Sequence, residues 1–274
     1  MTFARLLSSA RGRSRRLAAG GLLAIPLLMQ SCDPGCTPAP PPAPRWSEQV
    51  EIGTSFQGRP ITAYRLGTPG GTPILAVGAI HGEEQAGIEI VEHIRDTAAI
   101  PPGFDVWVVP TINPDGHALG SHGNARGVDL NRNFGPDWLP NDCAATPRYC
   151  AGPAPLSEPE SQAIATFVDS IQPRVTVWYH GPLNVVDAAT RHGVADPAVL
   201  AAYGGAAKYP VATVNCNPTG FCAGNATQYM NAGIDGSSAF VVELSTNAAG
   251  GMSPQGVTNH VAGFFAAAAV VGPG

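Results

Sequence analysis

Three residues of the sequence have the types and the spacing of a metal site. His81 and Glu84 lie three residues apart in the string HGEE, and His180 follows the apolar string VTVWY. Imidazole nitrogens and a carboxylate oxygen suit Zn²⁺, and three protein ligands leave one position of a single ion to water. A His-x-x-Glu pair alone often arises by chance, and a lone histidine is more often an ordinary hydrogen-bonded residue. The three together, in one chain with the acid and the Asn-Arg pair below, indicate metal-assisted hydrolysis.

Two further segments supply residues that bind a substrate or move a proton. Asn131 and Arg132 lie in the string RGVDLNRNF, where a guanidinium fork beside an amide can clamp a carboxylate. We expect Asp129 and Asn133 of the same string to be structural and to bond to nearby backbone. Glu243 lies in the apolar string FVVEL, where a buried carboxylate is costly unless it is paired or used. Either this strand points Glu243 to solvent, or burial near a metal makes it a general base.

The elements that must position these residues alternate between strand and helix. Such alternation is typical of an α/β fold with a mainly parallel sheet and helices on both faces. Ligands bind such sheets at the carboxyl ends of the strands, where His81 and His180 both fall. The string SEPE predicts a capping box, in which Ser157 caps a helix and Glu160 returns the bond. The expected strands cover 61–66, 73–80, 106–112, 175–179 and 239–244, and the expected helices cover 85–97, 157–171 and 257–271.

Composition divides the chain into three parts. Of its 274 residues, 13% are charged, about half the roughly 25% of an average domain, and Gly and Pro number 33 and 27. The glycines and prolines are spread among apolar segments, which indicates a loop-rich globular fold rather than disorder. Residues 1–32 combine arginines with a short apolar run and resemble an export leader. Residues 33–45 are a Pro- and Ala-rich linker, so we expect the catalytic domain at 46–274.

The charge of the expected domain limits its partners. Residues 1–32 hold five of the 15 Lys and Arg and none of the 20 Asp and Glu, so removing them changes the net charge from −5 to −10. A strongly acidic domain argues against nucleic acid or an anionic membrane as its partner. We therefore expect no nucleic acid, and the sequence leaves the oligomeric state open.

The six cysteines fit an oxidising compartment. Cys143 with Cys150, and Cys216 with Cys222, are close enough in sequence to predict two local disulfides. The string Ser31-Cys32 resembles a bacterial lipoprotein processing site, so Cys32 is either lipid-anchored or paired with Cys36. These features together predict an exported protein that is held in the cell envelope or secreted.

On these residues the chain resembles the zinc metallocarboxypeptidases of the carboxypeptidase A superfamily. It is most similar to the bacterial branch of murein peptide amidases, which cleave γ-D-glutamyl-diaminopimelate bonds. The matching strings are GRPI, NPDG, GVDLNRNF, SEPE and HGPL. The resemblance implies an α/β/α sandwich with a mixed sheet and a short peptidoglycan-derived peptide substrate with a free carboxylate. It also implies one Zn²⁺ on His81, Glu84 and His180, Glu243 as general base, and Asn131 with Arg132 on the carboxylate.

Three features depart from the pattern of that family. The family has an arginine upstream of the Asn-Arg pair that polarises the scissile carbonyl. Arg126 is the nearest catalytic candidate, but the position expected in the murein branch holds His122, and either residue could take the role. The family's mobile tyrosine has no counterpart in 216–222, which Tyr209 and Tyr229 flank. The strand after Glu243 also lacks the proline of the murein branch, which weakens the substrate assignment more than the chemistry.

Two other functions stay open on the sequence. One is a zinc acylamino-acid deacylase similar to aspartoacylase or succinylglutamate desuccinylase, which shares the metal motif and the Asp-Leu-Asn-Arg string. Export argues against it, because such deacylases usually act in the cytoplasm. The other is an envelope protein that kept the fold and lost catalysis, and binds peptidoglycan stems or a partner. Metal content would separate the binding protein from the enzymes.

Overall fold

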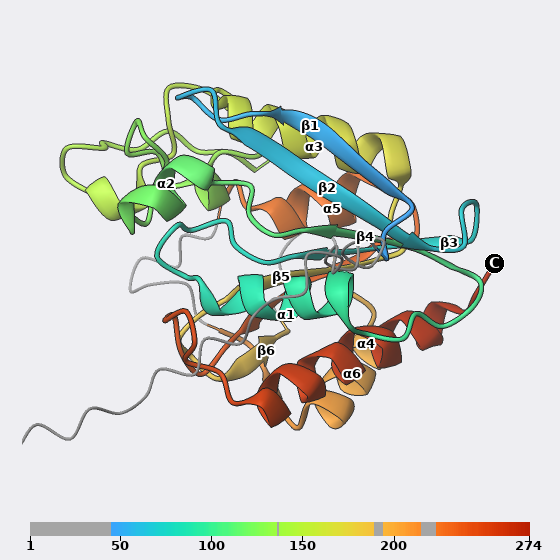
Figure 1. The fold of residues 1–274 in the computed structure, drawn as a ribbon. Coiled ribbons are helices and arrows are strands. Elements are labelled where there is room, and N and C mark those ends of the chain that lie inside the picture. The colour runs from blue at the N-terminus through green and yellow to red at the C-terminus, as the bar shows by residue number, and fades with distance from the viewer. Residues whose placement is uncertain (1–44, 136, 189–193, 215–222) are drawn as a thin grey trace, which may run out of the picture. The chain divides into compact units, whose positions relative to one another are not determined.

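A mixed sheet of eight strands forms the centre of the fold in the described part of the computed structural model, residues 45–135, 137–188, 194–214 and 223–274 (Figure 1). The strand order is β1-β2-β4-β3-β5-β8-β6-β7. The pairs β3–β4, β3–β5, β5–β8 and β6–β7 are parallel, and β1–β2, β2–β4 and β6–β8 are antiparallel. The strands are β1 (Glu48–Thr54), β2 (Pro60–Gly67), β3 (Thr72–Val77), β4 (Phe104–Val109), β5 (Val175–His180), β6 (Val185–Asp187), β7 (Val211–Ala212) and β8 (Ser238–Glu243).

Helices cover both faces of the sheet, which confirms the expected three-layer α/β/α sandwich with a mixed, mainly parallel sheet. The helices α1 (Ala86–Asp96), α4 (Pro197–Ala207) and α6 (Pro254–Val271) pack on one face, and α3 (Pro159–Ile171) and α5 (Ala226–Gly233) on the other (Figure 1). The short α2 (Pro114–Leu119) and the 3₁₀ turns η1 (Leu130–Arg132) and η2 (Pro147–Tyr149) lie in connections. None of the helices in the described ranges combines the length and apolar character needed to cross a membrane.

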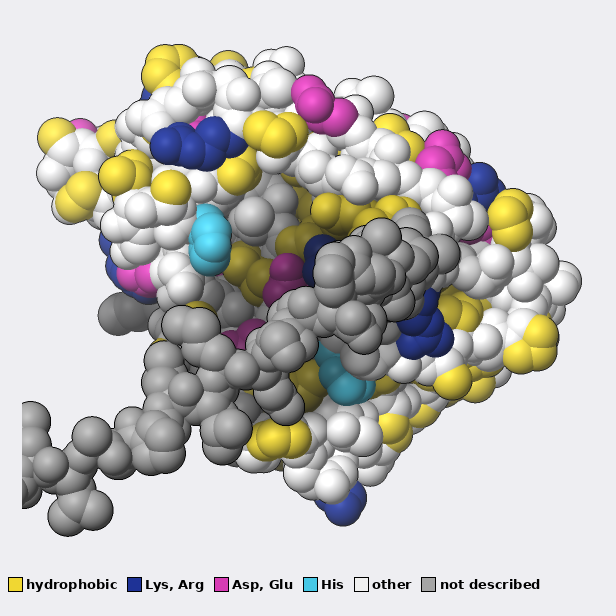
Figure 2. Space-filling view, viewed as in Figure 1, with side chains coloured by type: hydrophobic (Ala, Val, Ile, Leu, Met, Phe, Trp, Pro, Cys, Tyr) yellow, Lys and Arg dark blue, Asp and Glu magenta, His cyan; other side chains and the backbone are white. Residues whose placement is uncertain are grey.

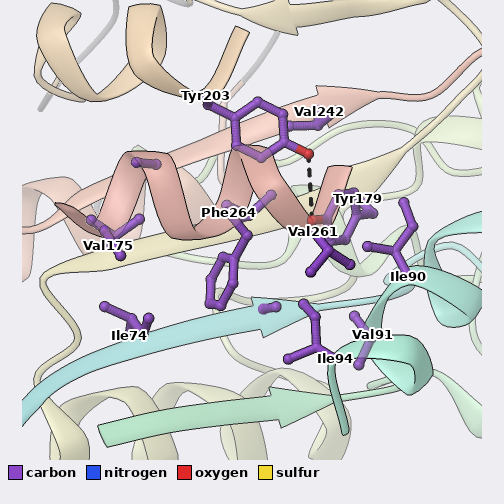
Figure 3. Packing of buried hydrophobic residues seen from close by; sticks show 14 of the residues in the cluster. Ile74, Ile90, Val91, Ile94, Val175, Tyr179, Tyr203, Val242, Val261 and Phe264 are labelled. Atoms are coloured by element: carbon purple, nitrogen blue, oxygen red, sulfur yellow. Dashed lines mark hydrogen bonds between the residues drawn. The ribbon is translucent and has the colours of Figure 1, made fainter. Parts of the chain in front are cut away.

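The central strands bury both of their faces. In β5, Val177 and Tyr179 belong to the core under α1, α4 and α6, whereas Trp178 between them belongs to the core under α3 and α5. Every residue of β4 and β5 is buried, which explains why these strands read as continuous apolar runs in the sequence. Figure 3 shows the first core, where Phe264 and Tyr203 meet the strand residues and the Tyr203 hydroxyl bonds to that of Tyr179.

The end of β3 differs from its sequence-based bounds. The apolar run 73–80 predicted one strand, but β3 ends at Val77 and 78–80 lead into the turn before α1. Helix α1 crosses close to the end of the strand. A Cβ on Gly78 would lie only 2.4 Å from the Pro110 carbonyl oxygen and 2.9 Å from the Ile88 Cα. Beyond Val77, backbone hydrogen bonds from Gly78 to Val109 and from Ile112 to Ala79 continue, and Ile80 is buried in the core under α3 and α5.

The capping box expected at 157–160 is wrong. The N-cap residue of α3 is Glu158, and its side chain makes no cap hydrogen bond. The Ser157 hydroxyl instead donates to Glu158 Oε1 at 2.8 Å, while Glu160 accepts from the Phe56 amide at 2.9 Å. The Asn124 side chain donates to both carboxylates, at 2.8 and 3.1 Å. Distant donors thus replace the local ones, because both glutamates are fully buried and need partners there.

Of the two disulfides predicted from the sequence, one lies within the described residues. The disulfide Cys143–Cys150 is present, which confirms the first predicted pair. The second, Cys216 with Cys222, lies outside the described residues, as do Cys32, Cys36 and the expected leader 1–32. The described residues belong to the compact unit Ala43–Gly274, and the expected domain 46–274 stays a prediction.

The Asn124→Ala variant tests the buried network at the start of α3. It removes the donor that Glu158 and Glu160 share, so we expect the free energy of unfolding to fall by about 2–4 kcal/mol. Denaturant unfolding measures this change. Gln255→Ala, on the exposed side of α6, is the control and should stay within about 0.5 kcal/mol of the parent. Equal stability of the two variants would show that the network does not hold the loop.

Candidate metal centre

The predicted site residues come together because three parallel strands end at one edge of the sheet. His81 and Glu84 lie between β3 and α1, and His180 is the last residue of β5, the parallel neighbour of β3. Glu243 is the last residue of β8 and pairs with His180 in the β5–β8 ladder. This edge of the sheet therefore gathers four side chains from three distant parts of the sequence, as expected for a ligand site in such a sheet.

Glu84 contacts both histidines of the predicted metal site. Its Oε2 atom is 2.9 Å from His81 Nδ1 and 2.9 Å from His180 Nδ1, and the two imidazole rings are 4.8 Å apart. All three residues are buried, with exposed fractions of 4–5%. His180 Nε2 is buried and has no hydrogen-bond partner among the described residues. Two imidazole nitrogens converging on one carboxylate oxygen are a donor set that fits Zn²⁺.

His122 is a third histidine within reach of the same point. Ligand atoms of His81, Glu84 and His122 all lie within 4.8 Å of one another, and the His122 ring stacks on His81 at 3.7 Å. However, both ring nitrogens of His122 already have carboxylate partners, Glu83 Oε1 at 3.2 Å and Asp129 Oδ2 at 3.3 Å. The direct contact between His180 and Glu84 therefore favours His180 as the third metal ligand.

The carboxylate of Asp129 contacts both stacked histidines, His81 and His122. Its carboxylate is fully buried, and its Oδ1 atom lies 3.1 Å from His81 Nε2 while accepting the Asn131 amide at 2.9 Å. The backbone contact was expected from the sequence, but the contact with His81 was not. A carboxylate on the second nitrogen of a metal-binding histidine fixes the orientation of its ring and strengthens the ligand. The position of Asp129 close to the Asn-Arg pair was the sequence signal that could have suggested its contact with His81.

Electrostatic interactions shift the pKa values of Glu84 and His81 in opposite directions. Burial opposes ionisation of Glu84, but the adjacent His81 and His180 outweigh it and hold the pKa of this carboxyl well below its usual range. Burial likewise lowers the pKa of His81, yet Glu84 and Asp129 outweigh it and raise that pKa to about 10. His81 is therefore a cation when no metal is bound. A metal ion replaces its proton as the partner of Glu84.

Glu243 is partly buried and its environment differs from that of Glu84. Burial raises the pKa of the Glu243 carboxyl, and the repulsion from Glu84 adds to this, while His180 opposes it. The partial burial of Glu243 at the end of β8 favours the interpretation of burial near the metal site over one in which the strand points this side chain to solvent. A carboxylate whose pKa is raised beside a metal site is suited to accept and return a proton.

The Asn-Arg pair lies on η1, one turn after Asp129. Asn131 Oδ1 accepts from the Ala226 amide at 3.1 Å, which ties η1 to the start of α5. Arg132 Nη1 donates to the Asn131 carbonyl oxygen at 2.7 Å, and its guanidinium lies 5.6 Å from the centre of the Tyr149 ring. Arg132 is thus held by its backbone neighbour and by an aromatic ring, and within the described part of the chain no other hydrogen bond occupies its guanidinium.

The structure separates the two candidates for the carbonyl-polarising role. Arg126 forms an ion pair with Glu158 at 3.4 Å and lies 5.4 Å from the Phe56 ring centre. None of its interactions among the described residues reaches the histidine cluster. His122 is in that cluster, stacked on His81. The geometry therefore favours His122 over Arg126 as the residue beside the metal centre.

The family's mobile tyrosine also has no direct counterpart among the two tyrosines that flank 216–222. The Tyr229 hydroxyl donates to Asp169 at 2.8 Å. The Tyr209 hydroxyl accepts from the Ser245 amide at 3.1 Å. The tyrosine that the described structure brings beside Arg132 is Tyr149, which the sequence gave no reason to select.

Comparisons with known proteins agree with this arrangement. A family model for zinc carboxypeptidases matches residues 42–187. Murein peptide amidase A of Escherichia coli (strain K12) is 32% identical over 145 residues, 49% of this chain and 60% of that protein. Bacteriocin BCN5 of Clostridium perfringens is 30% identical over 159 residues, 52% of this chain and 17% of that protein. The chain thus spans less than two thirds of the length of either relative.

The fold is also similar to solved structures. Murein-tripeptide amidase from Escherichia coli O157 superposes with a TM-score of 0.60 over 85% of this chain and 93% of that one, at 24% sequence identity. This similarity supports the fold, since its sequence identity is too low to carry function by itself.

Zinc affinity of two histidine variants tests which residue completes the metal site. His180→Ala removes a ligand, so we expect a loss of at least about 100-fold, more than the loss of an outer-shell partner causes. His122→Ala removes only a stacked neighbour and should cost about 10-fold or less. Competition with a chelator measures both. The reverse order of the two losses would make His122 the ligand and contradict the assignment.

Proposed function

Because the chain belongs to the zinc carboxypeptidase family, we propose that it is a zinc-dependent peptidase that hydrolyses an amide bond next to a residue with a free carboxylate. The observation that carries this proposal is the convergence of Glu84 with His81 and His180, beside Glu243 at the end of β8. That arrangement joins a zinc donor set to a carboxylate suited to proton transfer.

His81, Glu84 and His180 would hold the ion. A Zn²⁺ ion in this place supplies Lewis acidity toward a carbonyl oxygen and lowers the pKa of a water molecule. Asp129 keeps the ring of His81 in the ligating orientation through its contact with Nε2. The three ligands come from rigid positions at strand ends, which keeps the geometry fixed while substrate binds and product leaves.

Glu243 would carry the proton from the attacking water to the leaving amine. Its raised pKa supports this task, because a carboxylate with a higher pKa is a better base toward the attacking water. Its pairing with His180 in the β5–β8 ladder keeps the carboxylate beside the metal site.

Arg132 and Asn131 would hold the free carboxylate of the substrate. The guanidinium fork binds a carboxylate through two parallel hydrogen bonds, and the Tyr149 ring limits its movement. Fixing this carboxylate orients the peptide so that its scissile carbonyl reaches the metal site, which lowers the entropy cost of reaction.

The proposed substrates are peptides derived from murein. Support comes from the relative named murein peptide amidase A, which is 32% identical over 145 residues. The expected leader at 1–32 supports it independently, because an exported protein meets peptidoglycan in the cell envelope or outside the cell. A lipid anchor at Cys32 would keep the domain near that substrate.

A product assay by mass spectrometry tests this proposal. The zinc-loaded full chain is given the murein tripeptide L-Ala-γ-D-Glu-meso-diaminopimelate and ordinary peptides with free C-termini. We expect release of diaminopimelate, and Glu243→Gln should lower kcat by about 10²–10⁴-fold while zinc content stays the same.

Other outcomes of the assay would change the assignment. Release of ordinary C-terminal residues alone would keep the chemistry and exclude the murein substrate. Turnover by Glu243→Gln equal to that of the parent would contradict the role of the acid. No cleavage of any peptide by a zinc-loaded parent would contradict the proposed peptidase activity.

A further inference from the structure

The disulfide-closed segment 143–150 borders the candidate metal centre and contributes residues that the proposed mechanism does not use. Arg148 Nη2 lies 2.7 Å from Glu83 Oε1, and the same oxygen is 3.2 Å from His122 Nδ1. Tyr149 meets His122 edge-on, with ring centres 6.4 Å apart. One continuous series of contacts therefore runs from Arg148 to the histidine that stacks on the predicted ligand His81.

Hydrogen bonds join this segment to the residues around the metal centre. The Cys150 carbonyl accepts the amide of Asp129 at 2.8 Å, directly behind the carboxylate that holds His81. The side chain of Asn141 bonds to the Tyr149 carbonyl and accepts from the Ala151 amide at 2.9 Å. Together with the Cys143–Cys150 disulfide, these bonds give Arg148 a defined position relative to the metal ligands.

Two guanidinium groups border the contact between His122 and Tyr149. The guanidinium of Arg132 lies 5.6 Å from the centre of the Tyr149 ring. Arg148 immediately precedes Tyr149 in the sequence, and its partner Glu83 also contacts His122. The Arg148 side chain is 52% exposed, and its ion pair with Glu83 engages one end of a group that has five N–H donors. Two arginines that border one contact beside the metal centre are notable in a domain whose expected net charge is −10, where an acidic ligand is otherwise repelled.

We propose that Arg148 is a specificity-determining residue that binds a second carboxylate of the substrate. Arg132 takes the carboxylate next to the scissile bond, and Arg148 takes one further out, on the side chain of the same residue. The preferred substrates are then peptides whose terminal residue carries two carboxylates. This inference rests on the proposed function, since it assigns the substrate class of the same site.

Two tripeptides that differ in one carboxylate test the inference. L-Ala-γ-D-Glu-meso-diaminopimelate and L-Ala-γ-D-Glu-L-lysine are identical except for the distal carboxylate of diaminopimelate. In the zinc-loaded full chain, Arg148→Ala should raise KM for the diaminopimelate peptide by about 10- to 100-fold, the usual effect of losing a charge-assisted hydrogen bond. KM for the lysine peptide and kcat for both should change less than about 3-fold.

Matched variants separate recognition from a general loss of charge or structure. Arg174→Gln removes one positive charge before the start of β5, at the opposite end of the strand from His180, and should leave both KM values unchanged. Arg148→Lys keeps the charge without the fork and should retain part of the preference. An equal loss on both peptides, or no loss on either, would overturn the role of Arg148.

Binding to a non-hydrolysing form keeps this test independent of the proposed activity. Calorimetry on the zinc-loaded Glu243→Gln chain should show tighter binding of the diaminopimelate peptide than of the lysine peptide. Adding Arg148→Ala should remove that difference. If the parent cleaves neither peptide, the proposed activity fails, yet this binding difference still decides the role of Arg148. Equal affinities for the two peptides before Arg148 is changed would overturn the inference.

Discussion

The contacts of the Glu84 carboxylate with two imidazoles are the interaction on which the site depends. Glu84 is 5% exposed, and a buried carboxylate without partners would be costly. His81 and His180 supply those partners at 2.9 Å each, from the ends of two adjacent parallel strands. The order of the strands in the sheet therefore also affects the electrostatics of the site, because moving β5 away from β3 would remove His180 and leave Glu84 with only one of its two imidazole partners.

A second layer of buried polar contacts supports this arrangement. Asp129 orients His81, and its backbone amide binds the Cys150 carbonyl of the disulfide-closed segment. Further back, Asn124 bridges two fully buried glutamates at the start of α3. The connection between α2 and η1 is thus tied to the metal centre, to a helix and to the segment that carries Arg148. These ties explain how a loop-rich chain can hold catalytic groups in fixed positions.

The sequence predicts those features that depend on local pattern. Buried strands such as β4 and β5 were recognisable because both of their faces are apolar, and His81, Glu84 and His180 because ligands collect at strand ends. Features that depend on distant partners were missed. The partner of Glu83 is Arg148, 65 residues away, and Glu160 bonds to Phe56 across 104 residues. No periodicity or spacing encodes such pairs.

The most direct test of the account is the location of zinc in crystals of the metal-loaded protein by anomalous scattering at the zinc edge. The account predicts one strong peak, bound by the Nδ1 atoms of His81 and His180 and by the carboxylate of Glu84. Glu243 should lie beside the peak without ligating it. A peak bound by His122 in place of His180, or no peak near Glu84, would contradict the central claim.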